Sequence, residues 1–131
     1  MHKFASACFL AALLVLCGCT SPSKVIAPGF DVAVIDAMTK QPIAGASATV
    51  YADNNPDNAD RELADANGRV RVAALDSRTL CLPHCRPVDG RVSVRFGAQG
   101  YSAVVMPMPD FEETYVRANR PVELQHAPAP Q

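Results

Sequence analysis

The chain has 131 residues, of which 12 are Lys or Arg and 13 are Asp or Glu, so its formal net charge is −1. This balance lacks the basic surplus that nucleic-acid-binding domains show, so we expect no nucleic acid partner. The length suffices for one domain with a proper hydrophobic core and is too short for two domains of ordinary size.

Residues 1–18 have the layout of a secretory signal. Lys3 gives a charged start, and an unbroken apolar run then extends from Phe9 to Cys17. Because a transmembrane helix needs about 20 apolar residues, this run is too short to span a bilayer. A charged start followed by a short apolar run and small residues is typical of a signal peptide that is removed after export.

The end of this segment resembles the lipobox of bacterial lipoproteins. In Leu16-Cys17-Gly18-Cys19 the small Gly18 precedes a cysteine that would become the lipidated first residue. The resemblance implies an acyl anchor such as palmitate on Cys19. Thr20 is not an aspartate, which implies the outer membrane rather than the inner one. The domain would then face an oxidising periplasm or the cell surface. The alternative is an ordinary signal peptide that is cleaved at another site.

Residues 19–29 and 126–131 are predicted to be flexible ends, a lipidated tether and a disordered tail, because neither has an apolar period. Residues 30–125 lie between them and contain short runs in which apolar and polar residues alternate: FDVAVID, SATVYA, RVRVAAL, RVSVRF, YSAVVM and RPVELQ. No run has the apolar period of a helix. The pattern predicts a single all-β domain, an antiparallel β-sandwich of about seven strands.

Three short motifs in this region resemble the carboxypeptidase regulatory-like and transthyretin-like domains. They are T-x-x-P-I-x-G-A at residues 39–46, the turn D-A-N-G at residues 65–68, and the pair Gly100-Tyr101. The resemblance covers about residues 30–125 and implies an Ig-like or transthyretin-like β-sandwich. Such domains serve as spacers, adhesion modules and interaction partners, so the resemblance implies a fold and no particular activity.

The connection over residues 76–90 is longer than such domains usually have. It contains Cys81 and Cys85, which an oxidising compartment favours as a disulfide. Such a bond would hold the tip of the loop, with His84, in one shape. A structural zinc site needs four ligands, so Cys81, His84 and Cys85 would be one short. Metal binding and free thiols are the alternatives to the disulfide.

Several arginines form the predicted interaction surface. Arg69, Arg71, Arg91 and Arg95 alternate with apolar residues, so each is expected to point outward from its strand. On one sheet they would form a positive stripe that could meet phosphate or carboxylate groups of envelope polymers. The alternative is that acidic neighbours neutralise them or that their strands lie in different sheets. The candidate contact residues are those of the 76–90 loop and the strand after it: Arg78, His84, Arg86, Arg91 and Arg95.

Two groups of residues could bind metal ions. Asp53, Asn55 and Asp57 alternate as oxygen ligands do at the start of a calcium loop, but Ala64 stands where such loops need a glutamate. We therefore expect a solvated hairpin loop here and keep these three residues as the calcium candidate. Met106 belongs to a Met-Pro-Met run that would suit Cu(I), but it continues the inward face of its strand, so packing is its expected role. No cofactor is expected.

These features predict a non-enzymatic lipoprotein of the cell envelope that acts as a structural or protein-interaction module. The transthyretin-like sandwiches include hydroxyisourate hydrolases, but the tyrosine-arginine-glycine-serine ending of those enzymes is replaced here by HAPAPQ. One alternative is a carbohydrate-binding module for envelope polysaccharide, which would depend on Tyr51, Tyr101 and Tyr115 because the chain lacks tryptophan. Another is an accessory lipoprotein of a secretion or transport assembly. Some outer-membrane secretion lipoproteins share a transthyretin-like sandwich.

Overall fold

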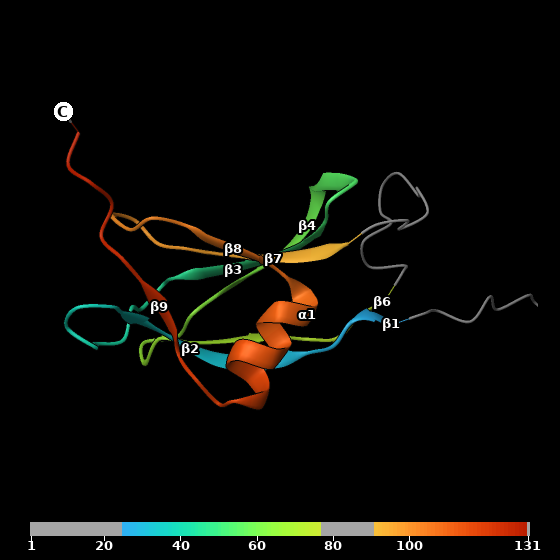
Figure 1. The fold of residues 1–131 in the computed structure, drawn as a ribbon, viewed down its shortest axis with the longest axis horizontal. Coiled ribbons are helices and arrows are strands. Elements are labelled where there is room, and N and C mark those ends of the chain that lie inside the picture. The colour runs from blue at the N-terminus through green and yellow to red at the C-terminus, as the bar shows by residue number, and fades with distance from the viewer. Residues whose placement is uncertain (1–24, 77–90, 131) are drawn as a thin grey trace, which may run out of the picture.

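The computed structural model of the protein describes residues 25–76 and 91–130, except for the side chains of Asp57 and Asn58. These residues form an all-β sandwich of two stacked sheets with one short helix (Figure 1). The all-β sandwich is therefore confirmed. The described part of the chain contains nine strands: β1 (Val25–Ala27), β2 (Phe30–Asp36), β3 (Ser47–Ala52), β4 (Asn55–Leu63), β5 (Arg69–Val72), β6 (Leu75–Asp76), β7 (Val92–Gly97), β8 (Val104–Pro107) and β9 (Val122–Leu124).

The strands are divided between a three-stranded sheet in the order β5-β2-β9 and a four-stranded sheet in the order β4-β3-β7-β8, while β1 and β6 pair separately. Paired strands run antiparallel, except that β9 runs parallel to β2. The sandwich is thus antiparallel, as expected, with β2 and β9 as its one parallel pair among the described strands. The connection that precedes β9 contains the helix, and it returns the chain to β2 in the parallel direction.

The alternation of apolar and polar residues places one face of each sheet in the core. In β2, Val32 and Val34 are buried, whereas Asp31 is exposed. The sheets meet through side chains that are almost fully buried, a packing that removes apolar surface from water and provides the main stabilisation of the fold. The largest of these side chains are Phe96, Phe111, Leu124, Val34, Val50, Val70, Val94 and Val122.

A helix follows β8, which the sequence pattern did not predict. The helical turn α1 (Met108–Phe111) continues as the π-helix η2 (Glu112–Arg117). Phe111 is fully buried, and its ring centroid lies 4.8 Å from that of Phe30 in β2 and 5.3 Å from that of Phe96 in β7. The helix therefore bridges the two sheets and closes the core on one side of the sandwich (Figure 1).

Both ends of the domain lie further out than the expected boundaries. Val25–Ala27 form β1, which pairs with β6, and Ala27 is buried, so part of the expected tether 19–29 belongs to the domain. At the other end, the Ala127 amide donates a hydrogen bond of 2.9 Å to the Gly100 carbonyl oxygen. The expected disordered tail therefore begins inside the domain. Main-chain hydrogen bonds hold both segments, and such bonds leave no apolar period in a sequence.

The expected loop over residues 53–60 is instead mostly strand. Ala52 pairs with Asn55, so Asp53 and Asn54 form a tight turn and β4 follows directly. The Asp53 carboxylate accepts a hydrogen bond of 2.7 Å from the Ser93 hydroxyl. A calcium loop needs an irregular backbone that wraps around the ion, and a strand that pairs with β3 cannot provide it. We therefore withdraw the calcium candidate at Asp53, Asn55 and Asp57, because their backbone is not that of a calcium loop.

Within residues 25–76 and 91–130, no helix has the length and apolar character needed to cross a membrane.

Candidate functional site

Several of the predicted site residues lie outside the residues that the structure describes. They are Cys19, Arg78, Cys81, His84, Cys85 and Arg86. The lipid anchor, the disulfide and the contact surface on the 76–90 loop therefore stay predictions. Arg91 and Arg95 lie within the described residues, just before β7 and inside it.

The arginines do not form one positive stripe, because they are divided between the two sheets, which was the alternative that the sequence left open. Arg69 and Arg71 belong to β5, whereas Arg95 belongs to β7 of the other sheet. Asp31 on β2 also pairs with both β5 arginines: its carboxylate oxygens lie 2.7 Å from Arg69 Nη2 and 2.9 Å from Arg71 Nε. Desolvation opposes the effect, but hydrogen bonds from both guanidinium groups lower the pKa of Asp31 below its usual value. Asp31 therefore neutralises one of the two positive charges on β5 and holds both guanidinium groups by hydrogen bonds.

A different pair of arginines comes together on the outer face of the four-stranded sheet. Thr49 in β3 pairs with Arg61 in β4 on one side and with Arg95 in β7 on the other. Directly opposite residues project from the same face of a sheet, and neighbouring strands lie about 4.8 Å apart. The two arginine α-carbons are therefore roughly 10 Å apart, with the Thr49 hydroxyl between their side chains.

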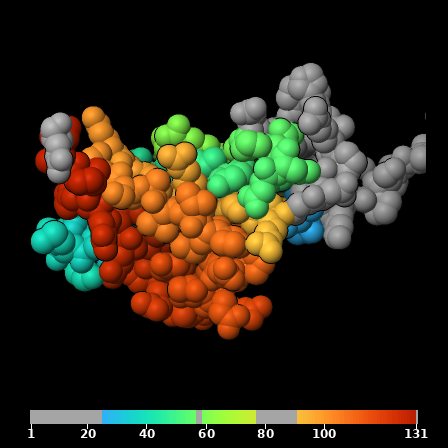
Figure 2. Space-filling model, turned by 45° about the horizontal axis from the view of Figure 1, so that its top comes forward, coloured from blue at the N-terminus to red at the C-terminus, as the bar shows by residue number. Residues whose placement is uncertain are grey.

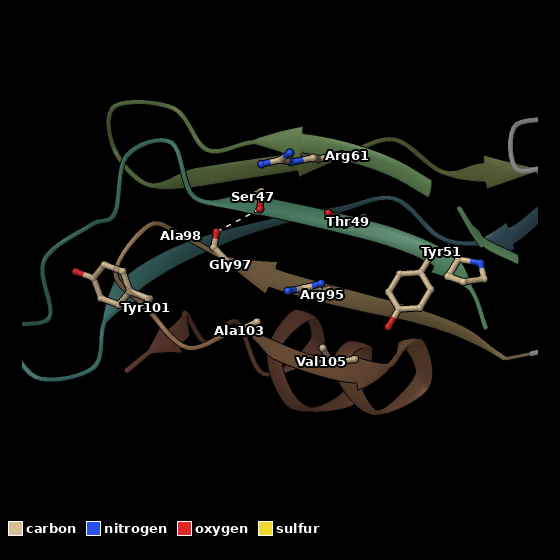
Figure 3. Close-up of a pocket in the computed structure, with 11 residues that line it drawn as sticks. Ser47, Thr49, Tyr51, Arg61, Arg95, Gly97, Ala98, Tyr101, Ala103 and Val105 are labelled. Atoms are coloured by element: carbon tan, nitrogen blue, oxygen red, sulfur yellow. Dashed lines mark hydrogen bonds between the residues drawn. The ribbon is translucent and has the colours of Figure 1, made fainter. Parts of the chain in front are cut away.

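These side chains line an open groove of about 670 Å³ (Figure 3). We call it the arginine groove. It is lined by residues of all four strands and of the β7–β8 connection: Ser47, Thr49, Tyr51, Pro56, Arg61, Arg95, Gly97, Ala98, Tyr101, Ala103 and Val105. None of these residues is acidic. Within the described part of the chain, neither Arg61 nor Arg95 has an ion pair.

The neighbours of Arg61 in sequence do not neutralise it. Asp60 and Glu62 flank it in β4, but alternate residues of a strand project to opposite faces of the sheet. Asp60 pairs with Val50, whose side chain is fully buried on the inner face. Neither Asp60 nor Glu62 therefore shares the outer face of β4 with the Arg61 guanidinium group.

The groove follows the direction of the strands, with a tyrosine at each end (Figure 3). At one end of the groove, Tyr51 lies in β3 close to the β3–β4 turn. At the other end, Tyr101 lies in the β7–β8 connection. Small residues such as Gly97 and Ala103 leave the space between them open. The Ser47 hydroxyl donates a hydrogen bond of 3.3 Å to the Gly97 carbonyl oxygen. The groove therefore offers hydroxyl groups in its middle and an aromatic ring at either end.

Tyr101 also belongs to a second constellation, which we call the Asp36 cluster: Asp36, Tyr101 and His126. The Asp36 carboxylate is buried, and one of its oxygens accepts hydrogen bonds from the amides of Met38 and Thr39 at 2.8 and 2.9 Å. Its other oxygen lies 2.9 Å from the Tyr101 hydroxyl and 2.7 Å from His126 Nε2. The carboxylate is thus surrounded by donors from three separate parts of the chain.

These donors stabilise the charged form of Asp36. The Thr39 amide makes the largest contribution, and burial opposes it, while Tyr101, the Met38 amide and His126 add to it. Together they hold the pKa of Asp36 well below its usual range. Conversely, the hydrogen bond to the Asp36 carboxylate raises the pKa of Tyr101, as do burial and the negative charge itself. The ring of Tyr101 stacks on that of His126, with centroids 4.6 Å apart.

The cluster ties together the end of β2, the β7–β8 connection and the C-terminal segment. Figure 2 shows this end of the molecule, where the turquoise residues after β2, the orange connection and the red C-terminal residues lie against one another. Because the Tyr101 hydroxyl and His126 Nε2 both contact the Asp36 carboxylate, we assign the cluster the role of positioning Tyr101.

The sequence pattern missed several of these residues. Arg61 lies outside every predicted run, because β4 is polar and shows no alternation of apolar residues. Asp36 could have been found, since it occupies a position of FDVAVID that the alternation assigns to the core. A carboxylate at a core position requires donors, and their identity depends on the tertiary fold. No protein family, curated protein or solved structure matches the chain.

Proposed function

We propose that this protein is a non-enzymatic binding module of the cell envelope, anchored by a lipid on Cys19, and that it contacts its partner through the arginine groove. The observation that carries the proposal is the pair Arg61 and Arg95, which lie on either side of Thr49 without an ionic partner among the described residues. A guanidinium group has five donors in a fixed fork, and an exposed pair without acidic neighbours favours an anionic partner.

The contrast with the other sheet supports this choice of surface. There, Arg69 and Arg71 pair with Asp31, and Lys40 in the turn after β2 pairs with Glu123 in β9 at 2.9 Å. The three-stranded sheet thus satisfies these basic residues internally. The four-stranded sheet leaves Arg61 and Arg95 without an ionic partner among the described residues, although the whole chain has more acidic than basic residues.

Binding rather than catalysis is favoured by the roles of the polar side chains. The described residues bring a carboxylate, a phenol and an imidazole together only in the Asp36 cluster. There the carboxylate accepts two main-chain hydrogen bonds in addition to the two side-chain contacts, as expected of a group that holds a turn in place.

Photo-crosslinking in cells tests the proposal. A photo-crosslinking amino acid at Val105, which lies in the groove and is 54% exposed, should give an adduct with an envelope component. The same photo-crosslinking amino acid in place of Arg71, on the other sheet, serves as the matched control and should give no adduct. The adduct from Val105 should disappear when Arg61→Gln and Arg95→Gln are combined.

The anchor is tested in the same cells. Cys19→Ala should release the protein from the membrane fraction, and the adduct from Val105 should decrease because the protein leaves its partner. Equal adducts from Val105 and Arg71, or an adduct that persists in the double arginine variant, would contradict the groove as the contact surface. A wild-type protein without an acyl group would contradict the anchor.

A further inference from the structure

We infer that the ligand of the arginine groove is an acidic glycan, a chain of sugars with carboxylate groups that lies along β3 and β7. This inference rests on the proposed function and specifies the ligand class of the same site. It is carried by the charge of the groove, its length, and the placement of its polar and apolar side chains.

The charge of the groove selects an anion. Arg61 and Arg95 contribute two positive charges, and none of the residues that line the groove is acidic. The central strands β3 and β7 are paired on both sides, so their main-chain N–H groups are used within the sheet. Recognition therefore depends on side chains, unlike the phosphate sites that are built from free amides at helix N-termini or turns. A planar carboxylate matches the guanidinium fork through two parallel hydrogen bonds.

The length of the groove selects a chain rather than a single small ion. Ser47, Thr49 and Tyr51 point from the same face of β3, and the span from Ser47 to Tyr51 is about 13 Å at about 3.3 Å per residue. Arg61 and Arg95 flank the middle of this span. A linear ligand along the groove would place a charged unit between the arginines and further units toward both ends.

The distribution of polar and apolar groups favours a sugar chain over a protein surface. Protein interfaces usually have an apolar centre and a polar rim. Here the middle of the groove is polar: Thr49 on β3 lies between Arg61 on β4 and Arg95 on β7. The exposed apolar residues lie beyond them, Leu63 two residues after Arg61 on β4 and Val105 opposite Arg95 on β8. Hydroxyl groups at Ser47 and Thr49 match the hydrogen-bonding groups of a sugar. Tyr51 provides an aromatic ring with a polar tip at one end.

Calorimetric titration of the full mature protein, purified from membranes in detergent, tests the inference. The probes are an oligogalacturonate, the same oligosaccharide with its carboxylates methyl-esterified, and a short poly-glutamate of equal charge. We expect binding of the oligogalacturonate and at least about tenfold weaker binding of the neutral ester, because charge-assisted hydrogen bonds are lost. Poly-glutamate should also bind more weakly, because it has no sugar rings to contact Tyr51.

Variants connect binding to the named residues. Arg61→Gln and Arg95→Gln should each weaken oligogalacturonate binding about tenfold. Arg120→Gln removes the same charge from an exposed position outside the groove and should leave the affinity within about twofold. Tyr51→Leu should weaken binding of the oligogalacturonate and leave that of poly-glutamate unchanged. Thermal unfolding of each variant shows whether the fold is retained.

The outcomes separate this inference from the proposed function. Equal affinity for oligogalacturonate and poly-glutamate, with no effect of Tyr51→Leu, would overturn the glycan assignment and leave an anion-binding interaction module. Binding that the two arginine variants do not change would overturn the groove as the glycan site. If no probe binds while the crosslink from Val105 persists, the acidic glycan is wrong and the interaction module stands. If no probe binds and the crosslink from Val105 is also absent, both the acidic glycan and the interaction module are wrong.

Discussion

The hydroxyl of Tyr101 donates a hydrogen bond of 2.9 Å to the buried carboxylate of Asp36. Tyr101 also lines one end of the arginine groove, so a single residue connects the candidate binding surface to the buried polar cluster. The position of the groove end is therefore determined by the contacts of the C-terminal segment and of the turn after β2. Stability and binding are expected to be coupled at this residue.

Tyr101→Phe tests this coupling. Removal of the hydroxyl takes one donor from a buried carboxylate, so the variant should be less stable at neutral pH than the wild type. Tyr115→Phe is the matched control. Tyr115 stacks on Phe111, and its hydroxyl has no hydrogen bond among the described residues. Urea unfolding measures both changes, and an equal loss of stability in the two variants would show that the Asp36 contact does not contribute.

The pH dependence of stability provides a second test. Because the pKa of Asp36 is lowered in the folded protein, its ionised form stabilises the fold fully above the unfolded value of about 3.9. The stabilisation is lost as the pH falls below that value toward the folded pKa. The free energy of unfolding should thus fall steeply below about pH 4 in the wild type and less steeply in Asp36→Asn.

Asp31 also has a lowered pKa and contributes in the same direction, so the experiment is best done in parallel with Asp31→Asn. The Asp36 variant should reduce the acid dependence more than the Asp31 variant, because Asp36 is buried with donors on both oxygens, whereas Asp31 is exposed. An acid dependence that is unchanged in Asp36→Asn would refute the role of the cluster.

Phe111→Ala tests the role of the helix as the bridge between the sheets. The ring is fully buried between Phe30 and Phe96, so its removal should lower the free energy of unfolding by about 3–5 kcal/mol. Thr114→Ala, at an exposed position of the same helix, should change it by less than about 0.5 kcal/mol. A small effect at both positions would mean that the helix is not part of the cooperative core.

Gly68→Ala tests the turn that leads into β5. Gly68 has a φ of 72°, and an added Cβ would lie 2.8 Å from the Val34 carbonyl oxygen. Gly45 has a similar φ of 74°, but an added Cβ would meet nothing within 4 Å. Gly68→Ala should therefore destabilise the protein by more than about 1 kcal/mol, and by more than Gly45→Ala. Equal losses in denaturant unfolding would show that backbone conformation alone matters.

The fold class could be predicted because alternation reports which side of a strand is buried. FDVAVID and RVRV show this directly, and the structure buries the expected valines. Alternation does not report which strands share a sheet. Arg69 and Arg95 were correctly expected to point outward, but whether they lie on one sheet stayed open, because sheet membership depends on long-range pairing.

The candidate site was only partly predictable for the same reason. The outward position of Arg95 could be predicted from the alternation in β7. Arg61 lies in a polar edge strand, β4, which is a strand because it pairs with β3 and not because of its composition. The helix was missed because α1 is a single turn, too short for a period to become visible, although Met108 and Phe111 are three residues apart and both buried. His126 lies near Asp36 because β9, which precedes it, pairs with β2. No local sequence pattern encodes this pairing.

The pairing of β1 with β6 shortens the distance that can separate the domain from the membrane. With a lipid on Cys19, only residues 20–24 separate the anchor from the first strand, and at about 3.3–3.6 Å per residue they span about 20 Å or less. Residues 19–29 as a free tether would have allowed roughly 35 Å. In Figure 1, β1 lies at the end of the sandwich opposite the C-terminus. The domain would therefore stand close to the lipid headgroups and sample only the layer of envelope polymer next to them.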